Sequence, residues 1–106
     1  MKREVVFSQS GRCLTARIQC DLDHHTARVV RENIDRMMFE NKPEILVLDF
    51  SSVEFMDSSG LGLILGRVEK AGALDAEVRL SGISPALMKL IRLSGIERVK
   101  NLSLMK

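Results

Sequence analysis

The sequence predicts an α/β fold, a small mixed β-sheet of about five strands with helices packed on it. Near the start of the chain, apolar and polar residues alternate as they do in half-buried strands. Further along, segments with helical spacing alternate with short apolar runs, and a strand–helix–strand order requires parallel crossover connections. The length of 106 residues is that of one domain, so we expect a single domain over 1–106.

Two strands are expected first, over Glu4–Ser8 and Leu14–Cys20. In the second, every other residue is apolar, and the segment "SQSGR" between the two has the glycine and polar residues of a hairpin turn. Cys13 and Cys20 are separated by an odd number of positions, so they point to opposite faces of one strand. We therefore expect free thiols, at least one of them buried.

A helix is expected from about Thr26 to Asn41, with Asp23 or Thr26 able to cap its start. Its apolar stripe consists of Ala27, Val30, Ile34, Met37 and Met38. After Pro43, which makes continuation of the helix unfavourable, the run "EILVLDF" (Glu44–Phe50) is apolar and too short for a helix. Such a run is typical of a central strand covered on both faces.

A second helix is expected from about Ser58 to Ala71, with Gly72 as its stop signal. The residues assigned to its buried face are Leu61, Ile64, Leu65 and Val68. The segment "AEVRLSG" (76–82) reads as a fourth strand, and "IERVKNLSL" (96–104) contains a short last one.

The third helix has the clearest boundaries in the sequence. Ser84 is placed as its cap, Pro85 as its first residue and Gly95 just past its end, the positions these residue types favour.

The segment "FMDSSGLG" (55–62) follows the central strand and opens the second helix. In open α/β sheets, ligands and partners bind at that edge. The first amides of a helix lack internal partners and carry partial positive charge, so a serine can cap them and a phosphate is favoured there. A capping serine without any chemistry remains an equal alternative.

Catalysis has little support in this segment. A nucleophile elbow is G-x-S-x-G, whereas this segment reads D-S-S-G, and His24 and His25 have no evident paired acid apart from Asp23 and Asp57. The chain contains no G-x-x-x-x-G-K-[ST] phosphate loop. We therefore expect no catalytic residue and no enzyme activity.

Gly62 and Gly66 stand four residues apart inside the second helix, where each glycine costs about 1 kcal/mol relative to alanine. Close packing of helix against sheet is one explanation. A flat surface that admits a partner's backbone is the other. Leu63 lies off the assigned buried stripe and is expected to be exposed, which favours the second explanation.

Composition excludes several classes of function. The net charge is +2 without a basic stripe, which argues against nucleic-acid binding. No apolar run is long enough to cross a bilayer, and the first residues lack the features of a signal peptide, so we expect a cytoplasmic protein without membrane contact. No cysteine or histidine spacing suggests zinc, and we expect no cofactor and no metal.

Three segments carry a family resemblance: "DLDHHTA" (21–27), "FMDSSGLGLILGR" (55–67) and "ISPALMKLIRLSGI" (83–96). They resemble the anti-sigma factor antagonists of sporulating bacteria, which belong to the STAS domain family, and among these the antagonists of the sporulation sigma-F regulator. The likeness covers nearly the whole chain. Cys20 and Asp21 differ from the family's usual glycine and glutamate. The resemblance also implies a further helix at the end, of which residues 97–106 can form only part.

The resemblance implies a regulatory cycle. The unphosphorylated antagonist, expected to be a monomer when free, docks on an anti-sigma factor that is also a serine kinase and so releases a sigma factor. The kinase phosphorylates the first serine of D-S-S-G, here Ser58, and a serine phosphatase resets it. Asp23 then faces the kinase and Asp57 flanks the acceptor. The implied partner-binding residues are Asp23, Asp57, Ser58, Ser59, Gly60, Leu61, Gly62 and Leu63.

The physical chemistry of a phosphoserine fits an off-switch at the interface. It adds roughly −1.5 to −2 charges, which a helix start accepts but a docked partner beside Asp57 does not. The hypothesis is local disruption of the interface without a change of fold. The alternative is a STAS module that serves as a scaffold in another signalling complex and lacks this switch.

Overall fold

The computed structural model describes residues 3–105 and confirms the expected order of elements. The elements are β1 (Val5–Ser10), β2 (Cys13–Ile18), α1 (His24–Asn41), β3 (Ile45–Asp49), α2 (Ser58–Ala73), β4 (Glu77–Ser81), α3 (Pro85–Ser94), a 3₁₀ turn (Ile96–Arg98) and β5 (Leu102–Leu104). The five strands form one mixed sheet in sequence order. β1 and β2 are antiparallel, and the remaining neighbours are parallel.

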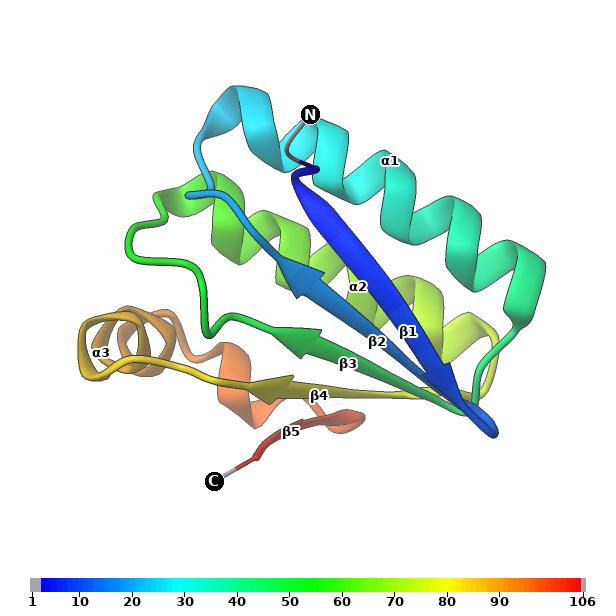
Figure 1. Cartoon of the computed structure of the whole chain (residues 1–106). Helices are drawn as coiled ribbons and strands as arrows, with labels where there is room; N and C mark the ends of the chain where they lie inside the picture. Colours follow the sequence, from blue (N-terminus) through cyan, green and yellow to red (C-terminus); the bar gives the residue numbers. More distant parts are fainter. Residues whose placement is uncertain (1–2, 106) are drawn as a thin grey trace.

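α1 and α2 lie side by side on one face of the sheet, and α3 lies beyond the carboxyl end of β4 (Figure 1). The strands turn fully buried side chains toward the two helices, namely Leu14, Ala16, Ile18, Leu46, Leu48, Val78 and Leu80. Because the parallel strands run in one direction, α1 and α2 both begin near the carboxyl ends of these strands. The fold therefore places two helix starts at the edge where the site was expected.

The expectation that β3 is covered on both faces is wrong. The face opposite α1 and α2 carries half-buried Asp49 and exposed Arg17, which are paired across β2 and β3, and Figure 1 shows no helix over it. Val47 on that face is nonetheless buried, because its neighbours in the register, Thr15 and Arg79, flank it. From an apolar run alone, a residue that is buried by side chains on the neighbouring strands cannot be told from one that is covered by a helix.

α1 begins at His24, two residues before the expected start, because Asp23 and Thr26 act together as a capping box. Its buried residues are Ala27, Val30, Ile34 and Met38. Met37 is only partly buried. The helix ends at Asn41 with Lys42 in the left-handed conformation, just before Pro43.

The buried face of α2 differs from the expected one. Leu65 is 40% exposed and Leu61 is half-buried, whereas Leu63, expected to be exposed, is only 3% exposed. Four neighbouring positions, 61 and 63–65, are all large and apolar, so spacing alone allows more than one face. The buried residues that define the face are Gly60, Leu63, Ile64, Arg67, Val68 and Ala71.

The caps of α3 are as expected: the Ser84 hydroxyl accepts from the Leu87 amide, and Gly95 is left-handed with φ 77°. Residues 97–105 contain the end of the 3₁₀ turn and β5 but no α-helix, so the expectation that this segment forms part of a further helix is wrong for the described residues. Both cysteines are free and half-buried, so the expectation of one buried thiol is wrong. Cys20 lies beyond the end of β2. Within residues 3–105, no helix has the length and apolar character to span a membrane.

A buried ion pair joins α1 to α2. Nε of Arg67 lies 2.9 Å from Oδ1 of Asp35, and the Arg67 side chain is 3% exposed. Burial lowers the pKa of Arg67, and the nearby Asp35 partly offsets this effect. Neither Nε nor Nη1 of Arg67 has an aligned hydrogen-bond acceptor among the described residues, so the pair depends on charge attraction.

Removing one partner of this pair should cost more than replacing both partners by apolar side chains. We expect Asp35→Ala to lower the free energy of unfolding by about 2–3 kcal/mol, since it leaves a buried charge uncompensated, and the double variant Asp35→Leu with Arg67→Met to change it by less than about 1 kcal/mol. Urea unfolding curves measure both. Equal losses in the two variants would contradict this account.

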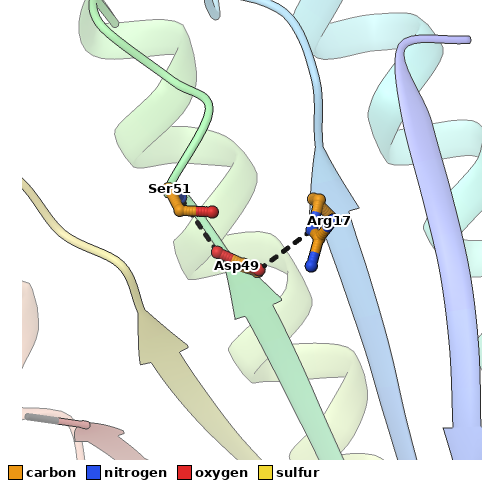
Figure 2. A network of polar contacts seen from close by, with 3 residues as sticks. All are labelled: Arg17, Asp49 and Ser51. Carbon is orange, nitrogen blue, oxygen red and sulfur yellow. Dashed lines mark hydrogen bonds and ion pairs between the residues drawn. The ribbon is translucent and has the colours of Figure 1, made fainter.

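On the open face, the Asp49 carboxylate organises the turn after β3 (Figure 2). It accepts hydrogen bonds from the Ser51 amide at 2.9 Å and from Nε of Arg17 at 3.3 Å. Burial raises the pKa of Asp49, but these hydrogen bonds outweigh it and hold the pKa below the ordinary 3.8. Gly82 passes close by: a Cβ there would lie 2.6 Å from the Ser51 nitrogen and 2.9 Å from Oδ1 of Asp49.

Gly82→Ala should therefore be more damaging than Gly95→Ala, although both glycines have positive φ. A Cβ at Gly95 meets nothing within 4 Å, so we expect only the backbone cost of about 1 kcal/mol. At Gly82, steric overlap adds to this backbone cost, so we expect the free energy of unfolding to fall by about 3 kcal/mol in total. Thermal or urea unfolding measures the stability of both variants. If Gly82→Ala loses no more stability than Gly95→Ala, the close contact at Gly82 is refuted.

Candidate functional site

The loops that precede α1 and α2 are bonded to each other. Leu22 and Met56 form an isolated parallel bridge, in which the Leu22 amide donates to the Phe55 carbonyl and the Asp57 amide donates to the Leu22 carbonyl, both at 3.0 Å. Leu22 and Met56 are buried. The two helix starts, more than thirty residues apart in the chain, are thereby fixed side by side.

Asp21 strengthens this junction. Its Oδ1 accepts from the backbone amides of Glu54 at 3.0 Å and Phe55 at 3.1 Å. In the sequence, Asp21 stood out only as a departure from the family pattern. The sequence offered one sign of this role, since aspartate readily accepts hydrogen bonds from backbone amides in loops. It did not indicate that the amides in question lie 33 and 34 residues away.

Asp23 and Asp57 are the N-caps of α1 and α2. Oδ1 of Asp23 accepts from the His25 and Thr26 amides, each at 2.9 Å. The Thr26 amide bond is the main cause that lowers the pKa of Asp23 below its ordinary 3.8, so this exposed carboxylate is ionised at neutral pH. Oδ1 of Asp57 accepts from the Ser59 amide at 2.7 Å.

The two serines differ in their surroundings. Ser58 is the exposed first residue of α2, and its hydroxyl has no hydrogen-bond partner in the described part of the chain, whereas Ser59 is half-buried. Both were expected to bind a partner. The cap itself is provided by Asp57, so the alternative of a capping serine is wrong for both residues.

The other residues assigned to partner binding divide into exposed and packed positions. Gly62 is exposed and Leu61 half-buried. Gly60 is buried against Met56, since a Cβ there would lie 2.8 Å from the Met56 side chain. Leu63 points into the core. The exposed surface at this helix start is therefore smaller than the sequence indicated.

Gly62 and Gly66 are not required by packing within the chain. A Cβ on either would meet nothing within 4 Å, so close packing of α2 on the sheet does not explain them. A surface left flat for a partner remains the explanation to test.

A groove of about 520 Å³ runs between the starts of α1 and α2. Its lining residues are His24, Ala27, Arg28 and Arg31 from α1 and Ser59, Gly62 and Leu63 from α2. Within residues 3–105, no group of three or more His, Cys, Asp or Glu side chains is arranged to hold a metal ion. Chemically, the site offers an exposed hydroxyl, two capping carboxylates and a basic groove.

Comparison with known proteins identifies the family. The model of the STAS domain family matches residues 4–104. An anti-sigma F factor antagonist of Paenibacillus polymyxa is 35% identical over 99 residues, which are 93% of this chain and 85% of that protein.

Two solved structures share the fold. The anti-sigma factor antagonist SpoIIAA in its unphosphorylated form superposes with a TM-score of 0.74 at 26% identity, over 96% of this chain and 87% of that one. The Bacillus cell fate determinant SpoIIAA in its phosphorylated form gives a TM-score of 0.72 at 27% identity, over 96% of this chain and 91% of that one.

Asp21 should protect the two amides it binds. In Asp21→Ala we expect hydrogen exchange of the Glu54 and Phe55 amides to accelerate about tenfold, as for the loss of about 1.4 kcal/mol of local stability. Asp21→Asn keeps an acceptor oxygen and should retain most of the protection. The Ser59 amide, bound to Asp57, is the internal control. Unchanged exchange at Glu54 and Phe55 in Asp21→Ala would show that the carboxylate does not hold this loop.

Proposed function

The chain belongs to the STAS domain family, and to its anti-sigma factor antagonists, and from this premise we propose that it docks on an anti-sigma factor with serine kinase activity and is switched off by phosphorylation of Ser58. Anti-sigma factor antagonists are regulatory proteins rather than enzymes. Docking displaces a sigma factor from the anti-sigma factor, and a serine phosphatase restores the active form. The free chain acts as a monomer in the cytoplasm.

The observation that supports Ser58 as the acceptor is its exposure at the first position of α2. Its hydroxyl is free within the described residues, whereas Ser59 is half-buried and its amide is bound to Asp57. A kinase can therefore reach Ser58 without unfolding the helix start.

The same position supports a switch that leaves the fold unchanged. The first amides of α2 and the positive end of its dipole favour a phosphate at Ser58. On the outer surface, the phosphate adds roughly −1.5 to −2 charges beside the carboxylates of Asp57 and Asp23. A partner that fits the unmodified surface then meets added bulk and negative charge, and it is released.

Incubation with the anti-sigma factor of the source organism and ATP tests the assignment. We expect intact-mass and peptide mass spectrometry to find one phosphate on Ser58, absent from Ser58→Ala and retained in Ser59→Ala, the matched control. The phosphorylated chain should bind the anti-sigma factor at least about tenfold more weakly, or about 1.4 kcal/mol.

Other outcomes separate the alternatives. Phosphate on Ser59, or phosphate retained in Ser58→Ala, would contradict the acceptor. Binding without any phosphorylation by an active kinase would indicate a STAS scaffold that lacks the switch. Amide spectra of the phosphorylated chain should change near residues 55–62 and in the α1 start; shifts throughout the sheet would contradict a local mechanism.

A further inference from the structure

The groove between α1 and α2 combines positively charged side chains on α1 with exposed backbone on α2. On α1, His24, Arg28 and Arg31 follow the i, i+4, i+7 spacing that places side chains on one face of a helix. On α2, Gly62 contributes no side chain, and the buried Leu63 adds little exposed apolar surface. None of the described residues that line the groove carries a carboxylate.

The positive charges in the groove are weakly compensated. Among the described residues Arg31 has no ion-pair partner, and Arg28 pairs only with Glu32 at 3.3 Å, with side chains 74% and 61% exposed. Such exposed pairs contribute little, so Arg28 can exchange Glu32 for another carboxylate. The positive charge of Arg31 also lowers the pKa of the buried Arg67.

The groove is continuous with the proposed acceptor. Ser59 lines it, and Ser58 precedes Gly62 by four residues, which places the two on one face of α2. A Cβ at Gly62 would meet nothing within 4 Å, so a partner's backbone can approach the helix there. A protein that covers Ser58 would therefore also cover the groove.

We propose that this groove receives an acidic segment of the anti-sigma factor, whose carboxylates pair with Arg31 and Arg28. The proposal rests on the proposed function and names the chemistry of the partner surface. The occupant is a polypeptide because the groove joins the charged side of α1 to exposed backbone at Gly62, which a second backbone can approach. Asp23 and Asp57 at the helix starts give the docking surface a negative end, so the charges also set the partner's orientation.

The groove also accounts for release after phosphorylation. A phosphate on Ser58 introduces negative charge on the face of α2 that carries Gly62. It then repels the acidic segment electrostatically. No movement of the core is needed for this repulsion.

Binding of the unphosphorylated chain to the anti-sigma factor, measured by calorimetry, tests the groove. The variant Arg28→Gln with Arg31→Gln removes two charges and keeps good helix formers. We expect its Kd to rise at least about tenfold and its salt dependence to weaken. The matched control is Lys89→Gln with Arg98→Gln, two exposed cations on α3 and the 3₁₀ turn, which should stay within about twofold of the unchanged chain. Thermal unfolding checks that both variants are folded.

Phosphorylation kinetics provide a second readout. Because the groove residues bind the partner without touching the reacting hydroxyl, the groove variant should raise the KM for the chain and leave kcat unchanged. In the anti-sigma factor, Asp or Glu→Lys substitutions should identify a site that restores binding to Arg31→Glu.

The outcomes distinguish the two proposals. If the unchanged chain binds and is phosphorylated while the groove variant binds equally well, the acidic segment is refuted and the proposed function stands. If the unchanged chain does not bind the anti-sigma factor, the proposed function fails and the groove proposal fails with it. Equal weakening of the groove variant and the control would show a general charge effect and would also overturn the groove proposal.

Discussion

The site depends on one constraint, the backbone bridge between Leu22 and Met56. Two reciprocal hydrogen bonds at 3.0 Å, buried under apolar side chains, join loops that belong to different crossover connections. Asp21 adds two further bonds to the second loop. Because such buried backbone bonds are costly to leave unmade, the loops cannot separate without loss of stability. The relative positions of Asp23, Asp57 and Ser58 therefore follow from the sheet, which brings both loops to one edge.

The carboxylates at this edge have two roles. Asp23 and Asp57 satisfy the first amides of α1 and α2, and Asp57 also places negative charge next to Ser58 in the chain. A cap fixes its carboxylate, so the charge stands at a defined place rather than on a mobile side chain. Local helix chemistry thus stabilises the helix starts and, under the proposed function, presents a fixed charge pattern to the partner.

The sequence predicted the order of the elements, the mixed sheet, both caps of α3 and the position of the serine segment, because periodicity and capping residues are local signals. It failed where the answer depends on neighbours in space. The buried face of α2 was misassigned because positions 61 and 63–65 are all large and apolar, and only packing selects Leu63 over Leu65. The open face of β3 was missed because Val47 is screened by adjacent strands. The role of Asp21 and the groove between α1 and α2 both require residues distant in the chain, which spacing does not reveal.

The packing beneath α2 explains why a modification at its start can stay local. Gly60 sits directly on Met56, Leu63 and Ile64 are buried, and Arg67 is paired to α1, so the lower side of the helix is held along its length. Its outer side carries Ser58 and Gly62. A Cβ added at Gly62 would meet no atom within 4 Å. A charge added at Ser58 therefore acts on whatever lies outside the helix rather than on the core. Under the proposed switch, a rigid helix start with a bare outer face limits the effect of one phosphate on Ser58 to the surface that the partner would cover.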